Sequence, residues 1–109
     1  MERIYNKLIR DNIPQIIESK GETPVVKTLD DAEYKSELEK KLYEEYKEVI
    51  EASGTDRIEE LADMIEVISA LAKLENNSLD DVISIAHKKS EKRGAFDKKI
   101  FLEKVIENK

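Results

Sequence analysis

Two consecutive segments with helical apolar spacing, separated by one glycine, constrain the fold of this chain more than any other feature. Apolar residues recur every three or four positions from Asp30 to Ser53, and this spacing resumes from Thr55 to about Asn76. Gly54 predicts the end of the first helix, and Thr55 predicts the N-terminal cap of the second. A connection this short favours two antiparallel helices packed side by side.

The second of these helices carries apolar side chains on two faces. One face holds Ile58, Leu61, Ala62, Ile65, Ile68 and Ala72, and the other holds Met64, Val67, Leu71 and Leu74. A helix that is apolar on two sides is normally buried between neighbours, and a chain of 109 residues leaves much of its surface exposed. We therefore predict an all-α helical bundle, a single domain over residues 1–109, that is completed by a homodimer or a higher homo-oligomer.

The segments before the two long helices predict one short helix and one extended stretch. Pro14 suits the first turn of a helix, because its missing N–H would have no partner there, and Gly21 predicts the end of that helix. Residues 23–29, "TPVVKTL", contain β-branched residues and a proline. We expect this stretch to be extended or to form a small strand.

A third long helix and an apolar tail follow. Ser78 predicts a cap for a helix from Leu79 to about Arg93, and Gly94 predicts its end. The tail from residue 95 onward contains several large apolar side chains, so we expect it to dock on the bundle, as a short helix.

The charge balance excludes several classes of function. The net charge of -6 argues against a generic nucleic-acid polymer as the partner, because nonspecific affinity for DNA or RNA depends on neutralising phosphates with lysine and arginine. The chain has no cysteine, so no disulfide framework is possible. It also has neither an apolar run of signal-peptide length nor one of the ~20 residues that span a membrane. These features predict a cytoplasmic protein without a membrane partner.

Four carboxylates lie on the packing faces of the two long helices. At about 100° per residue, Glu45 falls inside the apolar stripe of the first helix, and Glu48 lies at its edge. On the second helix, Glu60 and Asp63 share a face with Val67. Each helix therefore offers a carboxylate pair spaced i, i+3, and antiparallel packing would bring the two pairs together.

Converging carboxylates repel one another unless a cation lies between them. The chain has one histidine and no cysteine, so ligation by oxygen alone favours Mg²⁺ or Mn²⁺ over zinc. Mg²⁺ would also make an acidic protein compatible with a phosphorylated substrate. The alternative interpretation is that these carboxylates belong to solvated helix surface, as most such pairs do in a highly charged chain.

The same residues carry a resemblance to a known family. The segments "KLYEEYKEVIEA" and "EELADMIEVI" resemble the ExxE…ExxD signature of the MazG-like, all-α nucleoside triphosphate pyrophosphohydrolase superfamily, which includes phosphoribosyl-ATP pyrophosphohydrolase. The opening "YNKLIRDNIPQII" and the later "KKSEKRGAFDKKIFL" resemble a small single-domain branch of house-cleaning enzymes. The likeness spans nearly the whole chain.

This resemblance implies Mg²⁺-dependent hydrolysis of a nucleoside triphosphate to the monophosphate and pyrophosphate. It implies that Glu45, Glu48, Glu60 and Asp63 bind the metal and that Glu44 lies in an outer shell or at a second ion. Either Glu44 or Glu45 could accept the proton of the attacking water. The alternative functions are hydrolysis of phosphoribosyl-ATP and a non-catalytic helical interaction module.

Basic residues near both ends of the chain are the candidates for phosphate binding. Lys89, Lys92 and Arg93 close the third helix and resemble the family's "KRGxF" block, although cations at a helix end also favour the helix dipole. Lys7 and Arg10 are similar candidates.

The other residues considered are one asparagine, the single histidine and three tyrosines. Asn12 replaces an expected lysine, which puts a phosphate contact there in doubt, and His87 and the tyrosines at 34, 43 and 46 are expected to lie on helix surfaces or in packing.

Overall fold

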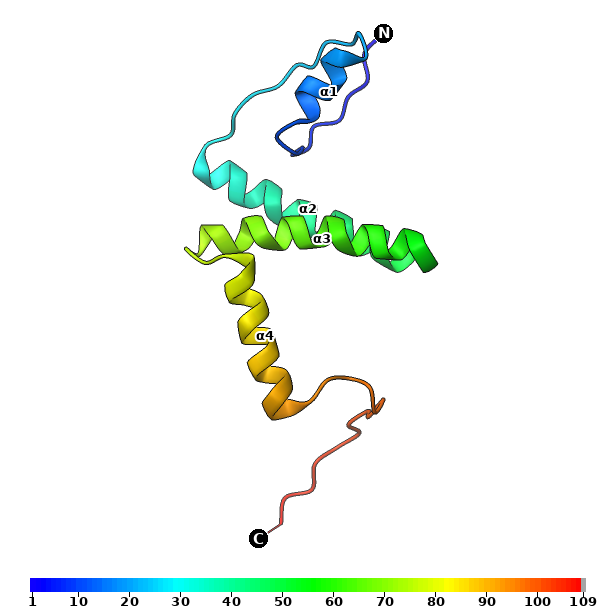
Figure 1. The fold of residues 1–109 in the computed structure, drawn as a ribbon, viewed down its shortest axis with the longest axis vertical. Helices are drawn as coiled ribbons and strands as arrows, with labels where there is room; N and C mark the ends of the chain where they lie inside the picture. The colour runs from blue at the N-terminus through cyan, green and yellow to red at the C-terminus, as the bar shows by residue number, and fades with distance from the viewer. Residues whose placement is uncertain (109) are drawn as a thin grey trace.

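The computed structural model describes residues 1–108 and contains four α-helices over that range. The helices are α1 (Ile13–Ser19), α2 (Asp31–Glu51), α3 (Gly54–Leu74) and α4 (Leu79–Arg93) (Figure 1). The all-α prediction is confirmed. No strand forms in residues 1–108, so 23–29 is not the small strand considered above. A lone extended segment has no partner strand to bond with. None of the helices within residues 1–108 has the length and apolar character needed to cross a membrane.

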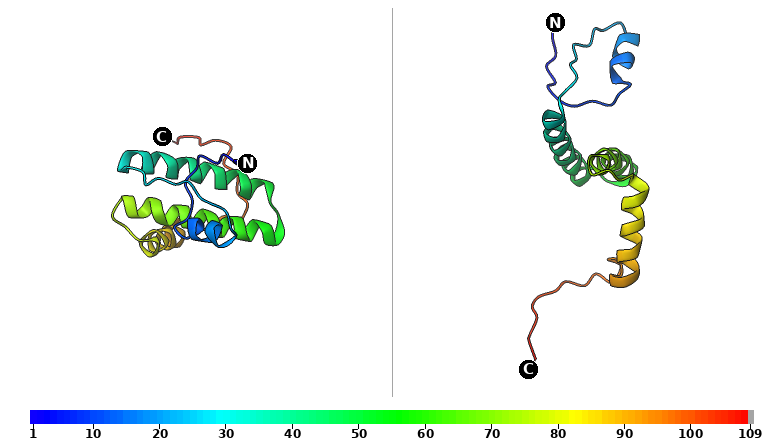
Figure 2. Two further views of the ribbon diagram at one scale, coloured as in Figure 1. Left: turned by 90° about the horizontal axis from the view of Figure 1, so that it is seen from above. Right: turned by 90° about the vertical axis from the view of Figure 1, so that its left-hand side faces the viewer.

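Helices α2 and α3 lie side by side and run in opposite directions, as the left view in Figure 2 shows. The buried apolar side chains lie on these two helices: Leu38 on α2, and Val67 and Ala72 on α3. Leu38 and Val67 belong to the apolar stripes that the sequence predicts to face inward. The core is therefore the seam of a helical hairpin.

Helix α3 begins two residues earlier than the sequence predicts. Gly54 is the first residue of α3 and adopts φ +58, and Ser53 is the N-cap. The predicted cap at Thr55 is therefore wrong, because Thr55 already lies in the first turn. A glycine meets little penalty in this left-handed conformation, so it reverses the chain here instead of merely ending α2.

Arg57 reinforces this junction from inside α3. Its Nε donates to the backbone oxygens of Val49, at 3.1 Å, and of Ala52, at 2.9 Å. The last carbonyls of a helix have no partner within the helix, so these bonds satisfy two acceptors at the end of α2. They also tie the first turn of α3 to the last turn of α2.

Helix α4 leaves the end of α3 at a steep angle, and the tail continues away from the hairpin (Figure 1). Ser78 caps α4 in a reciprocal capping box with Asp81. Helix α4 has no buried residue. Residues 94–108 form no helix and their apolar side chains are exposed, so the expected docking of the tail as a short helix is not found within the described chain.

The described chain is far more open than a globule of its size. Its radius of gyration is 19.1 Å, against about 13 Å for a compact domain of 100 residues. Its accessible surface is 10269 Å², roughly 4,000 Å² above the value expected for a folded monomer of 12.6 kDa. One face of α3 is part of this surplus, because Ile58, Leu61 and Ile65 are exposed.

Replacing Gly54 with alanine should destabilise the hairpin by about 1–2 kcal/mol, because an L-residue is strained at φ +58. Space is not the cause, since an added Cβ would meet no atom within 4 Å. Urea unfolding followed by circular dichroism measures the loss. Ser53→Ala is the matched control, because the Ser53 side chain makes no capping hydrogen bond and its removal should cost less than ~0.5 kcal/mol. Equal stability of Gly54→Ala and the parent would contradict this account of the turn.

Candidate metal centre

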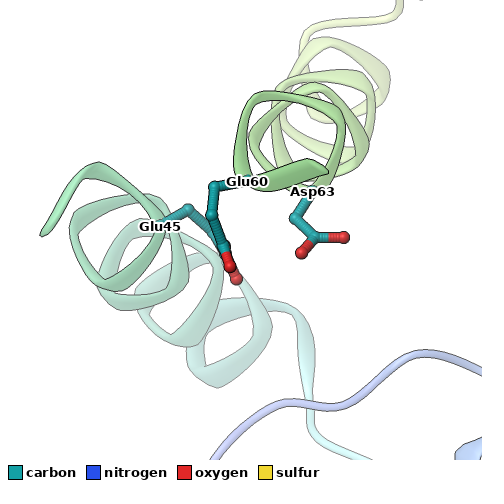
Figure 3. Close-up of side chains that lie close together, drawn as sticks. All are labelled: Glu45, Glu60 and Asp63. Carbon is teal, nitrogen blue, oxygen red and sulfur yellow. The ribbon is translucent and has the colours of Figure 1, made fainter. Parts of the chain in front are cut away.

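Three carboxylates converge between α2 and α3. Glu45 comes from α2, and Glu60 and Asp63 come from α3 (Figure 3). One oxygen of each lies within 4.8 Å of the others, a spacing at which a single ion can contact all three. The sequence predicts all three as metal ligands, and the structure brings them together.

Local helix geometry explains this convergence. Glu45 lies two turns after the buried Leu38, so its side chain projects into the same seam. Glu60 and Asp63 are three residues apart and therefore project from one face of α3. Because α2 and α3 are antiparallel neighbours, this face of α3 lies opposite Glu45 (Figure 3).

Glu45 is buried without a compensating partner. Its residue is only 6% exposed, and its Oε2 is buried with no hydrogen-bond partner among the described residues. Burial raises the pKa of Glu45, and the nearby charges of Glu48 and Asp63 raise it further, while Lys41 acts in the opposite direction. An isolated buried carboxylate is costly, so the position favours a cation beside it.

Glu60 is also perturbed by its acidic neighbours. Its Oε2 is buried with no hydrogen-bond partner in the described chain. The pKa of Glu60 is raised to about 7. The largest cause is a hydrogen bond that Glu60 can share with Glu48 when one of the two is protonated. Loss of solvent and repulsion from Glu48, Asp63 and Glu45 raise the pKa of Glu60 further. Near neutral pH the centre therefore holds either a proton or repelling charges.

The two basic residues of the N-terminal segment contact acidic residues at or beside the centre. Nη2 of Arg10 lies 2.7 Å from Oδ1 of Asp63 and donates a hydrogen bond to it. Nζ of Lys7 lies 3.6 Å from Oε1 of Glu44, which also has Nζ of Lys41 at 3.7 Å. Glu44 is thus held by two lysines beside the centre.

The donor set fits a hard divalent cation. All three groups offer carboxylate oxygens, which Mg²⁺ and Mn²⁺ prefer and which zinc sites seldom use without nitrogen or sulfur. Two buried carboxylate oxygens without partners, on Glu45 and Glu60, are the atoms that such an ion would satisfy. Glu45, Glu60 and Asp63 would hold the ion.

The other predicted site residues lie outside this triad. Glu48 is exposed and is not among the three converging ligands, although its charge acts on both Glu45 and Glu60. The basic group at Lys89, Lys92 and Arg93 lies on the half of α4 that points away from the hairpin, so it does not meet the centre within one chain. His87 is exposed on α4, as expected. The rings of Tyr43 and Tyr46 stack on the outside of α2 with centroids 6.1 Å apart.

Sequence reasoning missed two cationic contacts. Lys41 was not identified, although it precedes Glu45 by four residues and a helix places such pairs together. Arg10 pairs with Asp63, and its predicted contact with phosphate stays a prediction. Fifty-three positions separate these two residues, and no local pattern predicts such a contact.

Comparison with known proteins leaves the family of this chain open. A protein of Mycolicibacterium smegmatis described as an uncharacterized protein is 46% identical over 50 residues, which are 46% of this chain. The matched stretch spans about half of that relative's length, 51%. No protein-family model matches the chain, and no solved structure is significantly similar to it.

The raised pKa of Glu60 predicts how the stability of the metal-free protein depends on pH. The folded state favours the protonated carboxyl, so Glu60 contributes stability at low pH that is lost as pH rises from about 4.5 through about 7. Thermal melts in EDTA between pH 5 and pH 8 should show the parent losing stability relative to Glu60→Gln. Parallel curves for the two proteins would contradict the assignment.

Proposed function

We propose that this protein is a Mg²⁺-dependent nucleoside triphosphate pyrophosphohydrolase of the MazG-like superfamily, which cleaves the substrate to the monophosphate and pyrophosphate. The observation that carries the proposal is the convergence of Glu45, Glu60 and Asp63 within 4.8 Å, with the Glu45 carboxylate buried and unpartnered. These residues belong to the two segments that resemble the ExxE…ExxD signature. A solvated helix surface would not place a carboxylate inside the seam.

The proposed chemistry divides between the ion and the chain. Bound Mg²⁺ would neutralise the triphosphate and lower the pKa of a bound water. Glu60 and Asp63 would hold the ion from α3, and Glu45 would hold it from α2. Because both helices are rigid elements, the carboxylates keep their mutual geometry while the substrate binds.

Of the two candidate proton acceptors, Glu45 is favoured over Glu44. Glu45 is one of the three converging carboxylates, whereas Glu44 lies beside them with its Oε1 near Lys7 and Lys41. A proton acceptor needs an oxygen within hydrogen-bond reach of the water. Glu45 could offer the carboxylate oxygen that the ion does not bind.

The proposed enzyme acts as a homo-oligomer. The surplus of roughly 4,000 Å² of accessible surface exceeds what one partner usually contributes to an obligate interface. The exposed stripe Ile58, Leu61 and Ile65 on α3 supplies an apolar face for a second copy. A second copy would also allow the basic end of α4 to reach the centre of another chain.

An assay of several nucleoside triphosphates with Mg²⁺ tests the activity. The parent should release pyrophosphate and monophosphate in equal amounts, and Glu45→Gln should lower the rate by about 100-fold or more. Glu59→Gln is the matched control, because Glu59 is an exposed glutamate next to Glu60 on the same helix. Its rate should equal that of the parent.

The same variants should separate in their response to the ion alone. At one hundred times the dissociation constant, Mg²⁺ should stabilise the parent and Glu59→Gln by about 2.7 kcal/mol. Glu45→Gln should lose most of this gain, yet be at least as stable as the parent in EDTA because it removes a buried charge. If the protein cleaved phosphoribosyl-ATP and none of the nucleoside triphosphates, phosphoribosyl-ATP would replace them as the proposed substrate. Absence of both hydrolysis and the Mg²⁺ response would leave the interaction module as the better interpretation.

Light scattering at micromolar concentration should give a mass of at least twice 12.6 kDa. Ile65→Glu should reduce that mass, because it places a charge on the apolar face of α3. Val25→Glu is the control, since Val25 is 97% exposed and lies outside that face. A monomeric parent would contradict the proposed assembly.

A further inference from the structure

The N-terminal segment, residues 1–12, is joined to the hairpin by ion pairs between side chains. Helix α1, which follows it, packs against no other helix of the described chain. The two ties to the hairpin are Arg10 to Asp63 and Lys7 to Glu44. A faint blue ribbon from this part of the chain passes below the three carboxylates in Figure 3.

We propose that Arg10 is a resident counter-charge of the carboxylate centre, which a divalent cation must displace from Asp63 in order to bind. The proposal rests on the cation site of the proposed function and adds a residue that sets the affinity of that site. Arg10 is here a positioning residue that acts through Asp63.

Geometry makes the two cations competitors. The Arg10 guanidinium is 2.7 Å from Oδ1 of Asp63, and the same carboxylate is one of the three that converge within 4.8 Å. A Mg²⁺ ion binds oxygen at about 2.1 Å, so it would lie close to the guanidinium if both used that carboxylate. Two positive charges at such a separation repel.

The Arg10–Asp63 ion pair is weak enough for a bound cation to replace it. The Arg10 and Asp63 side chains are 56% and 46% exposed, and exposed ion pairs are held weakly. Asp63 therefore has a partner without the ion, while Glu45 and Glu60 keep buried oxygens that lack one.

The chain contains a closely matched control for this pair. Nη2 of Arg3 lies 2.8 Å from Oε2 of Glu22, with side-chain exposures of 59% and 47%. Both arginines lie in the N-terminal segment and form exposed pairs of nearly equal length. They differ in that the partner of Arg10 belongs to the carboxylate centre and the partner of Arg3 does not.

Calorimetric titration of MgCl₂ into the metal-free protein tests the competition. Arg10→Ala should bind Mg²⁺ about two- to five-fold more tightly than the parent, which corresponds to the release of one exposed ion pair. Arg3→Ala should bind with the affinity of the parent. Equal affinities in the parent and Arg10→Ala would overturn the inference while leaving the cation site intact. Absence of binding in the parent would overturn both the inference and the proposed function.

A second measurement follows Arg10 directly. In nitrogen-15 spectra of the arginine side chains, the signal missing from Arg10→Ala identifies the Arg10 guanidinium. On saturation with Mg²⁺ this signal should move toward the position of a solvated arginine, and the Arg3 signal should stay in place. Binding of Mg²⁺ without movement of the Arg10 signal would show that the pair persists, and would overturn the inference.

Discussion

Burial of the Glu45 carboxylate in the α2–α3 seam is the constraint on which the rest of the structure depends. The seam has a small apolar core, and Glu45 occupies part of it at 6% exposure. Removing a carboxylate from water is costly unless an opposite charge accompanies it. Glu48 on α2 and Asp63 on α3 increase that cost, and the three converging carboxylates could hold a metal ion at this place.

The cationic side chains around the centre follow from the same constraint. Lys41 moderates the charge at Glu45, Lys7 and Lys41 hold Glu44, and Arg10 holds Asp63. Two of these ion pairs, at Glu44 and at Asp63, join the N-terminal segment to the hairpin. The proposed metal binding and the attachment through Arg10 use the same carboxylate, that of Asp63.

The helices and the faces that carry Glu45, Glu60 and Asp63 were predictable from the sequence because they depend on local geometry. The 3.6-residue period places Glu45 with Leu38, and Glu60 with Asp63, whatever the rest of the chain does. The turn was predictable only in outline. Gly54 marks it correctly, but the cap is Ser53 and not Thr55, because Gly54 is already the first residue of α3. The predicted docking of the tail, from residue 95 onward, is not found in the described chain. Apolar composition predicts that side chains are buried, but it does not say against which surface.

The sequence by itself determined the class of fold, the antiparallel hairpin and the faces on which the acids lie, because helical periodicity and one glycine between two long helices leave little freedom. Only the tertiary structure decided that Glu48 stands outside the triad, that the basic end of α4 points away, and that Arg10 meets Asp63. Each of these depends on the direction in which one element leaves another. Such directions are set by contacts between residues far apart in the chain, which a local pattern does not encode.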